Sequence, residues 1–295
     1  PLIILDEGPN FLKKNLMKMG YDNFIEIKDN ETKKFKEFNL TIFKPFTKHI
    51  YEESLVGNLI DSALVLEDNN TVAINFNDNN PDEKACQFLN KKFKKIDLAL
   101  LNYNAAGPYP SCFDNLNENE KKDEHHRILK RNFEHLCKII PILEPKSVIP
   151  FAGSYIIGGK NYYKNNYLGT TTWDECADFL KQNLKFKINV VTLRENQTFD
   201  ILNQLQLEKY ERLDLDDMKK YIESIKDHKY EYEKDDEPDI SKLIEDSELA
   251  SKKMSERLKR FNAELNTNVF IQIKDKSIQI IKGKDEDRKL FCELD

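Results

Sequence analysis

The chain has 295 residues, of which 39% are hydrophobic and 33% are charged, and its formal net charge is −6. A chain of this length can bury a sizeable core in one or two domains, and it lacks the surplus of cations that a nucleic-acid-binding face requires. No apolar run reaches the roughly 20 residues of a membrane span, and no signal peptide is visible. The five cysteines form no C-x-x-C pair, which favours reduced thiols and a cytoplasmic location. Because the first residue is Pro1, we expect a trimmed N-terminus.

Hydrophobic patterns predict secondary structure along the first two thirds of the chain. In chain order, they predict a strand at residues 2–5, a helix at 11–19, strands at 23–27, 39–43, 62–66 and 71–76, a helix at 82–92, a strand at 96–101, a helix at 118–137, a strand at 145–150, a helix at 172–184 and a strand at 189–193. This order is strand-rich first and then alternates between helices and strands. It predicts an α/β fold of the layered α+β kind.

The composition changes after residue 197, where Asp, Glu and Lys become dense. Residues 235–239 (DDEPD) have the composition of a linker, residues 247–265 have the spacing of an amphipathic helix, and residues 269–281 have the pattern of a hairpin. We therefore predict a main region at residues 1–197, followed at 198–295 by a charged helical linker and a small C-terminal α+β subdomain. The apolar stripe of the helix is compatible with simple core packing or with a homodimer.

Unusual backbone residues are concentrated in one region. Five of the nine glycines and five of the ten prolines lie between residues 107 and 169. The loop at residues 102–113 (NYNAAGPYPSCF) follows a predicted strand, where α/β proteins commonly build sites. A second glycine-rich loop follows the next predicted strand, at residues 151–159. The candidate substrate-binding residues in and beside these loops are Asn102, Tyr103, Asn104, Tyr109, Ser154 and Lys160; the last is equally compatible with an exposed loop rim.

Two further residues are candidate metal ligands. His49 and Asp78 each follow a predicted strand, and imidazole and carboxylate groups at strand ends can bind a metal. Each has a simpler interpretation: His49 as an ordinary loop histidine, and Asp78 as part of an Asn- and Asp-rich turn.

In combination these segments resemble a known family. The strand that ends near His49, the segment DSALVLED, the strand that ends at Asp78 and the segment KIDLALLNYN together resemble the second half of a metallo-β-lactamase fold. The blocks NYNAAGPYPSCF and KSVIPFAGSYIIGG resemble more specifically the CMP-N-acetylneuraminate hydroxylase-like branch of that superfamily. The resemblance covers residues 2–193. It implies an αββα sandwich, of which this chain holds the second half, with a C-terminal helix and hairpin as an appendage.

The resemblance also implies a metal site. His49 and Asp78 match ligand positions for zinc or iron, and residues 102–113 and 151–159 would wall the pocket. The superfamily's H-x-H-x-D-H motif is nowhere in this chain, and we expect it upstream of Pro1. The late metal histidine is expected near residues 150–154, where the sequence reads PFAGS. The Rieske module of the hydroxylase needs paired Cys and His ligands, and no such spacing occurs here.

The function predicted from this resemblance is that of a metal-dependent hydrolase or oxygenase. The substrate would be a polar, sugar-like small molecule, with a nucleotide-linked sugar as one form, and the metal would activate water or oxygen. An oxygenase would also need a separate electron-transfer partner. The alternative is a metal-free binding or assembly module that keeps the fold, which the absent upstream motif and the lost late histidine favour.

Overall fold

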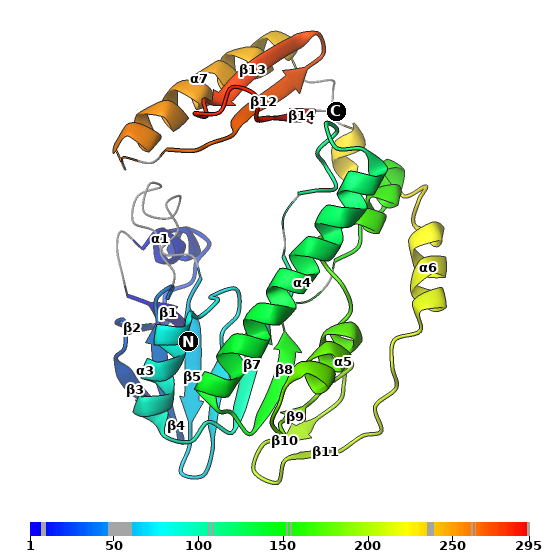
Figure 1. The fold of residues 1–295 in the computed structure, drawn as a ribbon. Helices are drawn as coiled ribbons and strands as arrows, with labels where there is room; N and C mark the ends of the chain where they lie inside the picture. The colour runs from blue at the N-terminus through cyan, green and yellow to red at the C-terminus, as the bar shows by residue number, and fades with distance from the viewer. Residues whose placement is uncertain are drawn as a thin grey trace. The chain divides into compact units, whose positions relative to one another are not determined.

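The computed structural model describes residues 1–6, 10–46, 61–105, 107, 109–151, 153, 155–234, 239–260, 262 and 264–293 (Figure 1). The chain forms two units, and each draws on three stretches of sequence. One unit comprises Pro1–Asn104, Leu129–Ser154 and Thr171–Leu213; the other comprises Ala105–Ile128, Tyr155–Thr170 and Asp214–Asp295. The domain boundary expected between residues 197 and 198 stays a prediction.

The first unit contains most of the strands. Its elements are β1 (Leu2–Leu5), α1 (Phe11–Lys18), β2 (Phe24–Ile27), β3 (Thr32–Phe35), β4 (Phe38–Phe43), β5 (Ala63–Glu67), β6 (Val72–Asn75), α3 (Glu83–Phe93), β7 (Leu98–Asn102), most of α4 (Glu118–Leu143), β8 (Ser147–Phe151), α5 (Trp173–Asn183), β9 (Asn189–Val190), β10 (Phe199–Asp200) and β11 (Leu205–Gln206). The alternation of strands and helices confirms the predicted α/β class.

A seven-stranded mixed sheet, in the order β3-β4-β5-β6-β7-β8-β9, organises this unit. The strands from β3 to β6 pair antiparallel, and those from β6 to β9 pair parallel. Two antiparallel steps separate β4 from β6, so β4 runs in the same direction as β6, β7 and β8. The chain therefore leaves all four of these strands at the same edge of the sheet.

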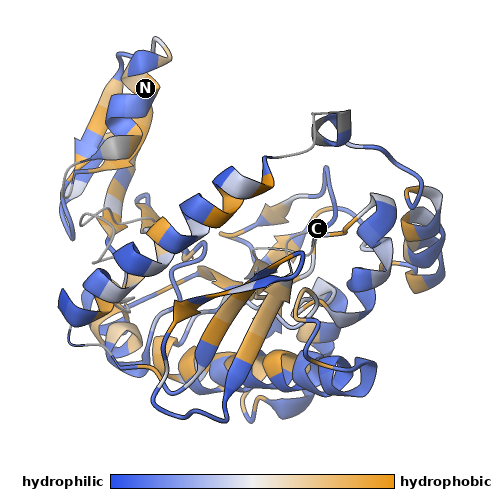
Figure 2. Ribbon diagram, turned by 90° about the horizontal axis from the view of Figure 1, so that it is seen from above, coloured by the Kyte–Doolittle hydropathy of each residue, from blue (hydrophilic) through white to orange (hydrophobic). Residues whose placement is uncertain are grey.

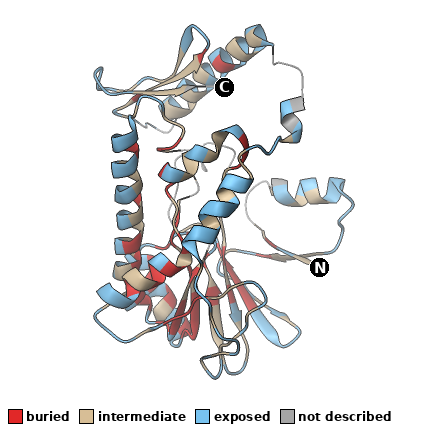
Figure 3. Ribbon diagram, turned by 90° about the vertical axis from the view of Figure 1, so that its right-hand side faces the viewer, coloured by how far each residue is buried: buried red, intermediate tan, exposed pale blue. Residues whose placement is uncertain are grey.

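The two faces of the sheet have different partners. Helices α3, α4 and α5 cover one face, and their apolar residues form one core with alternate residues of β5 to β8, such as Val65, Ile74 and Val148. On the other face, Leu40 and Ile42 of β4 pack against Ile27 in β2, which pairs parallel with β1. Buried residues accordingly gather in the strands of the large sheet and in the helices against it (Figure 3).

Local sequence signals explain where the covering helices begin. The side chain of Asp82 accepts a hydrogen bond from the backbone N–H of Ala85 at the start of α3. At the start of α5, Thr172 and Glu175 form a reciprocal capping box. Both arrangements satisfy N–H groups that a helix leaves unpaired at its first turn.

The elements of the second unit are a 3₁₀ helix (Gly159–Tyr167), α6 (Leu215–Ser224), a second 3₁₀ helix (Glu231–Lys234), α7 (Ile240–Arg260), β12 (Asn268–Ile273), β13 (Lys276–Ile281) and β14 (Lys289–Glu293). The predicted hairpin is confirmed as the antiparallel pair β12 and β13, and β14 joins β12 in parallel on its other side. Helix α7 packs against β13 and alternates between hydrophilic and hydrophobic residues (Figure 2).

Several predicted boundaries were wrong. The helix expected at residues 118–137 continues to Leu143, because Ile139, Ile140 and Leu143 extend its buried stripe past Cys137. The helix expected at residues 247–265 begins at Ile240 and ends at Arg260. The strand expected at residues 189–193 is limited to Asn189–Val190, since only its first residues pair with β8.

Candidate functional site

The loops after β6 and β7 meet at the edge of the sheet where the parallel strands end. Asp78 lies in the exposed turn after β6, and its carboxylate accepts a hydrogen bond from the side-chain amide of Asn102, at the end of β7, with a distance of 2.8 Å. The Asn102 side-chain oxygen in turn accepts a bond from the backbone N–H of Asn104 at 2.9 Å. The structure thus brings together Asp78 and Asn102, which the sequence proposed for different roles.

The next two residues of this loop are held by the segment before α5. Asn104 is only 7% exposed, and its side-chain amide donates to the Thr171 carbonyl and accepts from the Thr171 N–H, both at 3.0 Å. The Tyr103 hydroxyl donates to the same carbonyl at 3.2 Å, and Tyr103 is 1% exposed. Both side chains therefore have structural partners, and their role toward a substrate stays a prediction.

Asn79 is a residue of this edge that sequence reasoning missed. It is 2% exposed, accepts a hydrogen bond from the Phe46 N–H at 2.9 Å and donates to the Lys44 carbonyl at 3.1 Å. It thereby fixes the chain that follows β4 beside the turn that carries Asp78. The only signal in the sequence was its place in a run of Asn and Asp residues. His49 itself lies outside the described residues.

A cavity of about 410 Å³ opens at the ends of β7 and β8. Its walls are mainly apolar and are formed by Leu100, Tyr103, Ile149, Pro150, Phe151, Gly153, Trp173, Thr192 and Leu193. This volume is within the range of small-molecule sites, which commonly combine apolar walls with a few polar groups. The cavity lies at the edge of a parallel sheet where α/β proteins usually bind ligands.

A hydrogen-bond network fixes one wall of this cavity. The indole N–H of Trp173 donates to the hydroxyl of Tyr210 at 2.6 Å, and that hydroxyl donates to Asp174 at 2.8 Å. The second carboxylate oxygen of Asp174 accepts the backbone N–H of Leu213 at 3.0 Å. Burial, followed by the hydrogen bond to Asp174, raises the pKa of Tyr210, so this hydroxyl stays protonated. The indole ring is therefore held in one orientation.

Of the remaining predicted substrate residues, two belong to the second unit and one lies outside the described residues. Tyr109 belongs to the second unit, where its hydroxyl donates to Glu124 at 2.6 Å. Burial and this bond to Glu124 raise the pKa of Tyr109 to about 12. Lys160 is exposed at the start of the first 3₁₀ helix of the same unit, and Ser154 lies outside the described residues.

The described residues do not complete a metal site. No group of three or more His, Cys, Asp or Glu side chains that could hold a metal ion occurs among them. A catalytic zinc typically has three protein ligands, and in the described part of this edge Asp78 is the only one of our two candidate ligands. Among all the residues that the structure describes, no helix has the length and apolar character to cross a membrane.

Neither a family model nor a curated protein matches the chain. Solved structures that match include the diiron β-hydroxylase CmlA from Streptomyces venezuelae, with 12% identity, a TM-score of 0.39, and coverage of 62% of this chain and 35% of CmlA. They also include the metallo hydrolase Igni18 from Ignicoccus hospitalis, with 10% identity, a TM-score of 0.39 and 62% of each chain covered. The metallo-β-lactamase fold protein YhfI from Bacillus subtilis matches with 11% identity, a TM-score of 0.36, and coverage of 64% of this chain and 62% of YhfI.

The chain thus spans about a third of the length of CmlA and somewhat under two thirds of the other two proteins. YhfI is described as a protein of the metallo-β-lactamase fold, which is the fold that the sequence analysis names as a resemblance. The hydroxylase-like branch stays a prediction.

Proposed function

We propose that this protein is a metal-dependent hydrolase or oxygenase whose site lies at the edge of the large sheet where β4, β6 and β7 end. The observation that carries the proposal is the carboxylate of Asp78, held by the Asn102 amide at the end of a parallel strand. A carboxylate fixed in this way is a suitable ligand for a divalent metal, and ligands are commonly oriented by such secondary hydrogen bonds.

The topology supports His49 as a second ligand. It follows the end of β4, which runs in the same direction as β6, so both strands deliver their following loops to one edge. Asn79 anchors Phe46 beside the Asp78 turn, and His49 comes three residues later in the sequence. Zinc or iron would suit an imidazole and a carboxylate. Further ligands are required, so the proposal concerns metal binding at these two residues and not a reaction step.

The substrate is proposed from the sequence resemblance alone. A polar, sugar-like molecule, nucleotide-linked in one form, would meet the amide of Asn102 at this edge. The apolar walls of the neighbouring cavity, including Trp173, suit a less polar part of the same molecule.

Metal analysis of the full-length protein tests this proposal. We expect Asp78→Ala and His49→Ala each to lose most of the bound zinc or iron after dialysis, measured by mass spectrometry of the metals. The matched controls are Asp123→Ala and His126→Ala, which remove the same groups from exposed positions on α4. Unchanged metal content in both site variants would overturn the ligand assignment.

A second candidate function is metal-free binding of a small molecule. The mainly apolar cavity favours it, because such a cavity can bind a ligand without any metal. Calorimetry with cytidine and uridine sugar nucleotides on chelator-treated protein distinguishes the two functions. Affinity that is unchanged by metal removal supports the binding module, and affinity that requires the metal supports the enzyme.

A further inference from the structure

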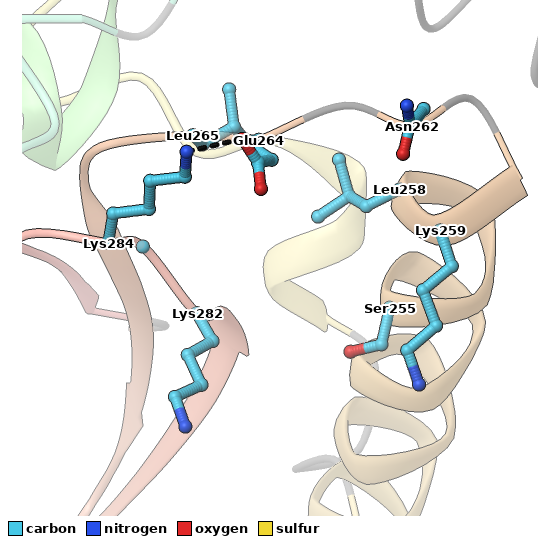
Figure 4. A pocket seen from close by; sticks show the side chains of 9 residues that line it. Ser255, Leu258, Lys259, Asn262, Glu264, Leu265, Lys282 and Lys284 are labelled. Atoms are coloured by element: carbon cyan, nitrogen blue, oxygen red, sulfur yellow. Dashed lines mark ion pairs between the residues drawn. The ribbon is translucent and has the colours of Figure 1, made fainter.

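A hollow of about 540 Å³ lies in the second unit, between the end of α7 and the chain that follows β13 (Figure 4). Ser255 and Lys259 reach it from α7, and Lys282 and Lys284 lie on the opposite side. Leu258 is among the apolar residues that line it. The hollow thus combines cationic groups on two sides with an apolar surface.

The charge inside the hollow is not balanced. Three lysines and one glutamate line it, and Lys284 forms an ion pair with that residue, Glu264. Lys259 and Lys282 have no ion-pair partner within the part of the chain that the structure describes. Both lysines are exposed and line opposite sides of the hollow, and an anion bound between them would be attracted to both ammonium groups.

A close backbone contact sets the position of the two lysines after β13. Gly283 lies directly against the chain before β12: a Cβ atom at this position would be 2.5 Å from the carbonyl carbon of Thr267 and 2.6 Å from the Asn266 oxygen. Only glycine permits this approach without a shift of the backbone. Lys282 and Lys284 therefore flank a glycine that packs closely against the chain before β12.

A buried side chain fixes the same segment by hydrogen bonds. Asn268 is 6% exposed, and its side-chain oxygen accepts bonds from the N–H of Gly283 at 3.0 Å and the amide of Gln279 at 2.8 Å. Its side-chain nitrogen donates to the Asp285 carbonyl at 2.7 Å. These bonds hold the loop after β13 around one buried asparagine. Lys282 and Lys284 therefore belong to a fixed segment of backbone.

We propose that this hollow binds a small organic phosphate of about nucleotide size. Lysine ammonium groups bind phosphate as point charges, and Lys259 and Lys282 would contact it from opposite sides. The volume of the hollow is within the range of small-molecule sites, and Leu258 and Leu265 would contact the uncharged part of the ligand. This proposal concerns residues of the second unit and does not depend on the metal site proposed for the first unit.

Binding of a fluorescent trinitrophenyl derivative of ADP to the full-length protein tests the inference. We expect the double variant Lys259→Ala, Lys282→Ala to weaken binding by about tenfold or more at low salt, because charged hydrogen bonds to phosphate are among the stronger polar contacts. The matched control Lys252→Ala, Lys253→Ala removes the same charge from exposed positions of α7. We expect this control to bind as the unchanged protein does.

Two competitors and one further variant sharpen the test. Inorganic pyrophosphate should displace the probe and adenosine should not, since the phosphate groups carry the recognition. Gly283→Ala keeps every charge but displaces the Lys282–Lys284 segment, so it should weaken binding while circular dichroism shows a folded protein. The inference is overturned if the unchanged protein does not bind the probe, if pyrophosphate does not compete, or if both double variants lose affinity equally.

Discussion

Asp97 is a buried charged residue of the first unit with several close polar partners. It is 2% exposed, and its carboxylate accepts the Val72 N–H at 3.0 Å and pairs with Lys146 at 2.8 Å and Lys95 at 3.4 Å. Its backbone also bonds to Val72 and Ser147, so it joins the starts of β6, β7 and β8. This is the sheet edge opposite to Asp78, and the role of Asp97 is therefore structural.

We expect Asp97→Asn to lower the free energy of unfolding by about 1–3 kcal/mol, because an amide leaves two lysines without their buried partner. Urea unfolding followed by the fluorescence of Trp173, the chain's only tryptophan, measures this change in the same unit. The control Asp123→Asn, at an exposed position, should change stability by less than about 0.5 kcal/mol. Equal unfolding midpoints for the two variants would show that the buried carboxylate contributes little.

Single residues of the site were only partly predictable from the sequence. The place of Asp78 at the end of a strand was predictable, because a carboxylate directly after an apolar strand is a recognisable pattern, and its role as a metal ligand stays a prediction. Asn79, its neighbour, was missed because its importance depends on Phe46, which lies far away in the sequence and becomes a partner only in the folded sheet. For the same reason the structural partner of Asn104, Thr171, could not be predicted.

At the scale of elements, the strength of the hydrophobic pattern decided what could be predicted. Strands β4 to β8 and helices α3 and α5 are anchored in the core and were all predicted close to their observed bounds. Helix α6 lies in the predicted charged helical linker but was given no bounds, because every one of its residues is exposed or half-buried and no core contact marks its ends. Strand β14 (KLFCE) was missed because charged residues stand at both of its ends and leave only three apolar residues between them.

The glycine pair at residues 158 and 159 shows an element placed by backbone geometry. Gly159 has a φ of +64°, and a Cβ atom there would lie 2.8 Å from the carbonyl oxygen of His228. Its N–H donates to the Ile225 carbonyl at 2.9 Å, and the Gly158 N–H bonds to the Tyr230 hydroxyl at 3.2 Å. The pair therefore packs the first 3₁₀ helix against the segment that follows α6, and this packing accounts for both glycines.

We expect Gly159→Ala to destabilise this packing by about 1–3 kcal/mol, since alanine is strained at positive φ and its methyl group meets a backbone oxygen. The midpoint of thermal unfolding, measured by circular dichroism, should fall by several degrees. Gly153→Ala is the matched control, because no atom of the residues that the structure describes lies within 4 Å of a Cβ placed there. An unchanged midpoint for Gly159→Ala would contradict this prediction. It would mean that the segment after α6 can shift to accommodate the methyl group without loss of stability.

At the scale of the whole molecule, the order of elements predicted the α/β class, whereas the grouping of the chain into units was beyond the sequence. Each unit is assembled from three separate stretches, and helix α4 contributes to both. Such grouping depends on contacts between distant segments, and local periodicity carries no information about them. The sequence could place the candidate site at one edge of the sheet. It could not show whether a full set of metal ligands is present there.

The pH dependence of stability should reflect two buried groups of the first unit. The Nε2 atom of His135 is buried and makes no hydrogen bond to any described residue. Burial lowers the pKa of His135 below 6.5, and the nearby cations Lys138 and Arg131 act in the same direction, against the Pro81 carbonyl and Glu83. For Asp97, burial alone would raise the pKa, but the bonds from Lys146 and Val72 outweigh it, so the pKa lies below 3.8.

Both shifts make the unfolded chain bind more protons than the folded one as the pH falls, so both reduce stability in acid. The contribution of His135 is complete above its ordinary pKa of 6.5 and is lost below it, whereas that of Asp97 is lost only below about pH 4. Between pH 7 and 5 we therefore expect the free energy of unfolding to decline, with His135 contributing to the decline. Urea titrations of His135→Phe at several pH values should show a flatter curve over this interval, while the exposed His126→Phe should keep the original slope. Parallel curves for His135→Phe and the unchanged protein would show that the buried imidazole is protonated as readily in the folded chain as in the unfolded one.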